Sequence, residues 1–254
     1  MWLLLACADE PAAPVRWAHG PDVAVANEVV LVPYYAVRDT LHIYDVRAEI
    51  PGCTVTEGDP VVLEGPCAWN DRTWTGRAEV SLVGDAAEVT LDGWGWEGSN
   101  GWQQRFLDAP VEGVPELVFS GSFHVEGWEP GDRDGWAATL DGELAVGLEG
   151  RWRDECVREP GEPMDVSAAW TVSSYRAENA GTLHDSTITG EVSASTVGAY
   201  TFAQESEKER CDAKPQEARI DVADGADTVT SRLAGCAWDW EWRTSAGLVG
   251  RFCI

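Results

Sequence analysis

Basic residues are scarce in this chain: 18 Lys and Arg stand against 44 Asp and Glu, a formal net charge of −26. Only Lys208 and Lys214 are lysines. Because phosphate binding needs a concentrated basic surface, this balance excludes a nucleic-acid partner. It also argues against electrostatic adhesion to anionic lipid. A strongly acidic surface instead keeps an exported protein soluble.

Motifs of catalysis, metal binding and nucleotide binding are also missing from the sequence. There is no G-x-S-x-G elbow and no HxH or HExxH pair. No two cysteines form a CxxC pair, so no zinc site is indicated. With 44 acidic residues, carboxylate pairs occur everywhere, and Asp239 with Glu241 gives little support to a hydrolase. We therefore predict that the protein is not an enzyme and that it has no cofactor, no metal and no nucleotide ligand.

The cysteine count is odd, at seven, and Cys7 stands alone near the start of the chain. The other six are Cys53, Cys67, Cys156, Cys211, Cys236 and Cys253. Six scattered cysteines without metal-ligand spacing indicate three disulfides, and hence an oxidising compartment outside the cytosol.

The start of the chain explains the seventh cysteine. Leu4-Leu5-Ala6-Cys7 resembles the bacterial lipobox, in which a signal peptidase cuts before a diacylated Cys, and this resemblance implies a membrane anchor through a lipid on Cys7. The Pro/Ala-rich residues 8–28 are interpreted as a tether. Residues 1–7 are shorter than a signal peptide, so we expect the true start codon to lie upstream. The alternative is a short apolar N-terminus with an incidental cysteine.

The region after the tether carries a helical pattern. Pro33 is expected in the first turn, where its missing N–H costs nothing, and Pro51-Gly52 after the end. The β-forming residues Val29, Leu31 and Ile43 leave a strand as the alternative. Apolar side chains recur at steps of three and four, which places on one helical face Val30, Tyr34, Val37, Leu41, Tyr44 and Ala48.

From Cys53 onward the apolar period changes to two, which is typical of strands with one buried and one solvated face. We predict about a dozen strands in an antiparallel meander. It is folded either as a sandwich or as a broad curved sheet, with the helix on one face and disulfides as staples. The side chains predicted to face inward are Leu117, Phe119, Phe123, Val125, Leu144, Val146, Leu148, Trp152, Val166, Ala168, Trp170, Val172, Ile188 and Val192.

Asp-Gly and Asn-Gly pairs separate these runs and supply the positive φ that tight hairpins require. They are Asp92-Gly93, Asn100-Gly101, Asp134-Gly135, Asp141-Gly142 and Asp224-Gly225. The acidic stretches 132–135 and 221–227 faintly resemble calcium loops, but they lack the ligand spacing and the closing Glu of an EF-hand. We interpret both as hairpin turns.

One short module occurs twice: Gly65-Pro66-Cys67-Ala68-Trp69 is echoed by Gly235-Cys236-Ala237-Trp238. If the modules are equivalent, each closes on the cysteine that precedes it. The resulting disulfides are Cys53–Cys67, Cys211–Cys236 and Cys156–Cys253. The alternative keeps the first and changes the others to Cys236–Cys253 and Cys156–Cys211.

These features together resemble uncharacterised Cys/Trp/Gly-rich secreted lipoproteins of myxobacterial type. The likeness rests on the lipobox-like start, the helical segment running into a cysteine, the Gly-Cys-x-Trp hairpin and the Trp/Gly/Asp-rich strands. It covers most of the chain without a diagnostic motif. It implies a β-rich, disulfide-bonded surface domain and carries no catalytic residues.

Fourteen tryptophans are the most unusual feature of the composition. Trp238, Trp240 and Trp242 alternate, so a strand would present all three on one face, and Trp94 and Trp96 repeat the arrangement. An exposed row of indoles would serve as a platform for sugar rings, whereas an inward row is core. Because so many exposed aromatic side chains would favour aggregation, core packing is the expected role.

The sequence thus predicts an exported cell-envelope protein anchored by a lipid on Cys7, with one β-rich domain over residues 29–254. We expect its sheet to be a non-enzymatic structural or interaction surface, with another envelope protein as partner. A glycan-binding module that uses the indole rows is the second hypothesis. A secreted hydrolase is the third.

Non-reducing peptide mapping of the exported protein tests the disulfide pairing. We expect cross-linked peptides that join Cys211 to Cys236 and Cys156 to Cys253, because duplicated modules should close in the same way. A peptide that joins Cys236 to Cys253 would show instead that the alternative pairing is right.

Overall fold

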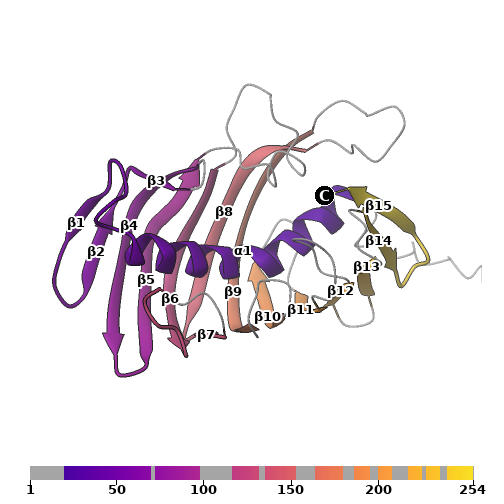
Figure 1. Ribbon diagram of the computed structural model, residues 1–254. Helices are drawn as coiled ribbons and strands as arrows, with labels where there is room; N and C mark the ends of the chain where they lie inside the picture. The colour runs from indigo at the N-terminus through magenta and orange to yellow at the C-terminus, as the bar shows by residue number, and fades with distance from the viewer. Residues whose placement is uncertain are drawn as a thin grey trace, which may run out of the picture.

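In the computed structural model (Figure 1), the chain forms one long antiparallel sheet and a helix that lies across one of its faces. The mainly β fold with one N-terminal helix is therefore confirmed, and of its two expected forms the broad curved sheet is observed. The structure describes residues 20–69, 72–97, 116–131, 135–152, 164–179, 186–194, 200–207, 217–224, 227–234 and 239–253.

The fifteen strands follow one another through the sheet nearly in chain order, as expected for a meander. Two strands depart from this path: β3 pairs with β4, and β8 pairs with β6 and β9. The elements are α1 (Gly20–Asp45), β1 (Thr54–Thr56), β2 (Val61–Glu64), β3 (Cys67–Trp69), β4 (Arg72–Val83), β5 (Ala86–Glu97), β6 (Glu116–Glu126), β7 (Ala137–Leu140), β8 (Glu143–Trp152), β9 (Met164–Asn179), β10 (Ser186–Ala194), β11 (Tyr200–Glu207), β12 (Glu217–Asp224), β13 (Asp227–Ala234), β14 (Asp239–Thr244) and β15 (Val249–Cys253).

Helix α1 begins earlier than the sequence pattern predicts, so residues 20–28 of the expected tether are helical. Pro21, rather than Pro33, occupies the first turn, where a missing N–H is tolerated, and Pro33 lies inside the helix. The strand alternative is wrong for this segment. Ala48 is exposed beyond the helix end, while the other predicted core positions that are described are buried, namely Tyr34, Val37, Leu41 and Tyr44.

The strands curve around α1, which runs along the sheet and contacts both its halves (Figure 1). Its contacts extend from β4 through β10, β11 and β12 to β15. More of the helix is buried than one apolar stripe, because the buried residues also include Ala36, Asp39, Thr40 and Ile43. No helix in the described part of the chain has the length and apolarity to cross a membrane.

Aromatic side chains fill the core between α1 and strands β4 to β6. Trp74, Trp94 and Trp96 are 0%, 0% and 2% exposed. The Trp74 ring centre lies 4.7 Å from that of Trp96 and 5.5 Å from that of Trp94, and Phe119 continues the stack at 5.3 Å from Trp96. Such aromatic contacts contribute beyond the area they bury.

A β-bulge in β5 turns two of these tryptophans inward. Val89 and Leu91 face the core at odd positions, whereas Trp94 and Trp96 face it at even ones. The change of phase coincides with register shifts against both neighbouring strands, so β5 carries one extra residue at Asp92-Gly93. The prediction of a hairpin turn at this pair is therefore wrong, because the positive φ of Gly93, 57°, serves the bulge instead.

Other turn predictions have different outcomes. Gly142 connects β7 to β8 with a φ of 122°, as expected. Asp224, the last residue of β12, pairs with Asp227, the first residue of β13, which confirms a hairpin there. Residues 100–101 and 132–134 lie outside the described part of the chain.

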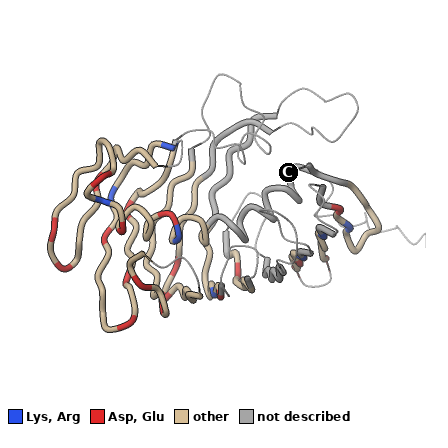
Figure 2. The backbone as a smooth tube through the Cα atoms, viewed as in Figure 1, with Lys and Arg blue, Asp and Glu red and all other residues tan. Residues whose placement is uncertain are grey.

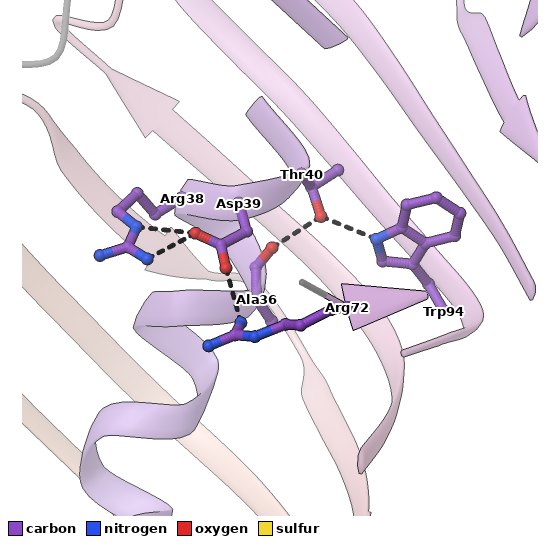
Figure 3. A network of polar contacts seen from close by, with 6 residues as sticks. All are labelled: Ala36, Arg38, Asp39, Thr40, Arg72 and Trp94. Atoms are coloured by element: carbon purple, nitrogen blue, oxygen red, sulfur yellow. Dashed lines mark hydrogen bonds and ion pairs between the residues drawn. The ribbon is translucent and has the colours of Figure 1, made fainter. Parts of the chain in front are cut away.

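A buried polar network joins α1 to the sheet (Figure 3). Arg72 of β4 donates to Asp39 at 2.7 Å, and Arg38 donates to the other carboxylate oxygen at 2.6 and 2.8 Å. Trp94 Nε1 donates to the Thr40 hydroxyl at 3.0 Å, which itself donates to the carbonyl of Ala36. Burial lowers the pKa of Arg72, and the Asp39 charge opposes that shift.

The disulfide Cys53–Cys67 is present, as predicted, and ties the start of β1 to β3. A hydrogen bond from Ala68 N to Pro51 O, 3.0 Å long, joins the same two segments. The remaining predicted pairs involve Cys156, Cys211 and Cys236, which lie outside the described residues.

Replacing Asp39 with Asn tests the buried ion pair. We expect the free energy of unfolding to fall by about 3–5 kcal/mol, because Arg72 keeps its charge in the core without a counter-charge. Urea denaturation measures the loss. The double variant Asp39→Leu/Arg72→Met removes both charges and should be closer to wild type than Asp39→Asn. A single variant within about 0.5 kcal/mol of wild type, the usual range for surface substitutions, would contradict the assignment.

Candidate functional site

A groove of about 800 Å³ lies at the C-terminal end of the sheet, over strands β13 to β15. Its described lining consists of Thr230, Arg232, Glu241, Trp242, Arg243, Val249 and Gly250. Basic and exposed aliphatic side chains therefore meet in this concave surface.

Strand alternation sets which of these side chains point outward. On β13, Val229 and Ser231 are buried toward the core, so Thr230 and Arg232 lie on the opposite face. The register pairs Arg232 with Glu241 and Thr230 with Arg243, which places all four on that outer face. The face turned away from α1 is therefore polar at this end.

Three arginines gather on this face. Arg219 of β12 is directly opposite Arg232, and Arg243 lies on the next strand. Asp221 binds Arg219 at 2.6 Å and accepts a hydrogen bond from Thr230 at 2.6 Å. Neither Arg232 nor Arg243 forms an ion pair with any described residue.

Three arginines this close together are unusual in a chain of net charge −26, although Asp221 and Glu241 lie on the same face. Like charges directly opposite each other on neighbouring strands destabilise a sheet. Figure 2 shows acidic segments at the tips of the β1–β2 and β4–β5 hairpins, whereas acidic and basic segments lie close together around β12 to β14. The arginines are therefore placed where an added anion would relieve their repulsion.

Apolar surface borders the arginines. Val249 is 63% exposed and is the register partner of Arg243, and Leu248 beside it is 40% exposed. Trp242 alternates with Arg243, so its half-buried ring lies on the inner face, where it packs over Gly250 and against the core. Gly250 is needed here because a Cβ at this position would collide with the indole of Trp242.

The structure places the tryptophans of the two predicted indole rows differently. Trp94 and Trp96 lie in the core, so they form no exposed platform. Trp242 lines the groove, while Trp238 and the side chain of Trp240 lie outside the described residues. The side chain of Cys253 and the whole of Cys7 are likewise not described.

Sequence reasoning missed Arg232 and Arg243. Each follows the strand alternation of its own segment, but only the pairing of β13 with β14 brings them together. The hydrolase hypothesis relied on Asp239 and Glu241. In the strand register Glu241 is opposite Arg232, so a cation rather than a second carboxylate faces it on β13.

A second groove, of about 660 Å³, lies beside the β4–β5 and β6–β7 hairpins and is lined in part by Asp85, His124, Glu126 and Glu178. His124 of β6 lies between the buried residues Phe123 and Val125 on the opposite face of the strand, and its Nδ1 is 2.6 Å from Glu88. The described residues contain no group of three or more His, Cys, Asp or Glu side chains able to hold a metal ion.

Comparison with protein-family models, with curated proteins and with solved structures found no match to this chain. The functional argument therefore rests on the site alone.

The pKa of His124 should fall when Glu88 is replaced by Gln. The hydrogen bond to Glu88 is the main cause of a pKa above the ordinary 6.5, and Glu126 adds to it. Because the pKa of His124 is higher in the folded than in the unfolded protein, its protonation stabilises the fold. This stabilisation is complete at a pH below the unfolded-state pKa and is lost as the pH rises through the folded-state pKa. An NMR titration of His124 that showed the same pKa in Glu88→Gln and wild type would contradict this assignment.

Proposed function

We propose that the protein is a non-enzymatic binding domain of the bacterial cell envelope, anchored through a lipid on Cys7. The lipobox-like residues Leu4 to Cys7 support the anchor, and the Cys53–Cys67 disulfide supports an oxidising compartment. The domain would then stand outside the cytosol with the outer face of its sheet available to a partner.

The observation that carries the binding role is the pair Arg232 and Arg243, which line one groove and form no ion pair with a described residue, although Glu241 is opposite Arg232. A guanidinium group is a strong, directional donor to carboxylate and phosphate oxygens. Two such groups held on adjacent strands form a fixed recognition surface, because strand pairing sets their spacing. Binding through these two guanidinium groups requires no catalytic residue in the groove.

A glycan-binding role is the second candidate, and of the predicted indole rows only Trp242 is among the described residues that border the groove. Its ring lies over Gly250 on the face opposite to Arg243, so the apolar contact for a sugar ring on the arginine face comes from the exposed Val249. The buried positions of Trp94 and Trp96 take the other row out of this hypothesis.

Replacing Cys7 with Ser tests the anchor. In the native host, wild-type protein should fractionate with membranes and carry the mass of a lipid on Cys7, whereas Cys7→Ser should be found in the soluble exported fraction. One or two acyl chains supply the membrane affinity that the acidic surface does not.

Cys53→Ser is the matched control, because it removes a different cysteine and should leave the lipid in place. The proposed function would be overturned if the wild-type protein were found in the soluble fraction, or in the cytosol with free thiols.

A further inference from the structure

We infer that the groove over β13 to β15 binds a short anionic saccharide, whose carboxylates are held by Arg232 and Arg243. This inference rests on the proposed binding function and names its ligand class. Three properties of the groove carry it: two arginines that form no ion pair with a described residue, a polar lining, and an apolar border at Val249.

The two arginines of the groove favour an anionic ligand. Arg232 and Arg243 lie on adjacent strands of one face, on a diagonal of the β13–β14 register. Diagonal neighbours in a sheet are about 7–8 Å apart, which is close enough for two carboxylates of one short chain to meet both guanidinium groups. Asp221 is already engaged by Arg219 and Thr230, so it is not available to neutralise them.

The rest of the lining suits sugar hydroxyls and ring faces. Glu241 is opposite Arg232 in the register and lines the same groove, where its carboxylate would repel a second anion. The exposed side chain of Val249, on the same face as Arg243, provides the apolar contact for the C–H face of a sugar ring. A volume of about 800 Å³ accommodates a few sugar units.

A densely charged partner fits less well. An anionic membrane or a nucleic acid would bring negative charge against Glu241 and Asp221 as well as against the arginines. The net charge of −26 would oppose its approach. With a Debye length of about 8 Å at physiological salt, the local field of the groove governs a small ligand. A saccharide whose carboxylates are separated by neutral hydroxyl groups fits this arrangement of charges.

Isothermal titration of the full exported chain tests the inference with trimers of galacturonate, glucuronate and mannuronate. We expect at least one of them to bind saturably, and maltotriose, the neutral control, not to bind. Arg232→Gln/Arg243→Gln should raise the Kd about tenfold or more, because charge-assisted hydrogen bonds are lost. Affinity should fall as salt is raised.

Arg176→Gln is the matched control, since Arg176 is also an exposed strand arginine but lies on β9, away from the groove. It should bind like wild type. Val249→Ser, an exposed position, should weaken binding without unfolding the protein, which circular dichroism checks.

Equal binding of maltotriose, equal or tighter binding of a hexaglutamate peptide, or no binding of any uronate trimer would each overturn the inference. The anchor experiment on Cys7 is independent of these results. Membrane-anchored protein that binds no uronate leaves the proposed envelope function intact, whereas unanchored cytosolic protein that binds uronates contradicts that function alone.

Discussion

Burial of α1 against the curved sheet is the constraint on which the fold depends. An antiparallel sheet with one apolar face must cover that face with another layer, and here a single helix does so from β4 to β15. The ion pair between Asp39 and Arg72 fixes where the helix sits (Figure 3). Because an unpaired charge in the core costs several kcal/mol, sliding the helix along the sheet would be strongly unfavourable.

The aromatic core is built around the same crossing. Trp94 bonds to Thr40 of the helix, and Arg72 lies 4.4 Å from the ring of Trp96. The bulge in β5 is what brings these tryptophans inside, because one extra residue reverses which side chains face the helix. The row formed by Trp94 and Trp96 therefore belongs to the core at this end of the sheet, in the role expected from the sequence.

Because the helix occupies the inner face, the outer face is left for recognition. At the C-terminal end this face combines Arg232 and Arg243 with Val249, and Gly250 makes room for Trp242. The candidate site is thus a consequence of the sheet register. It could be predicted only in part from the chain, since Trp242 was recognised as a candidate and the arginines were not.

Local patterns determined the class of fold. The period of two in residues such as Phe119, Phe123 and Val125, and the helical spacing from Tyr34 to Tyr44, were sufficient because they depend only on near neighbours along the chain. The Cys53–Cys67 disulfide followed from a short repeat. Tertiary structure alone decided that Asp39 is buried, that β5 carries a bulge at Asp92-Gly93 and that Arg232 lies beside Arg243. Each of these depends on strand pairing or helix docking between distant segments, and no local spacing encodes such pairing.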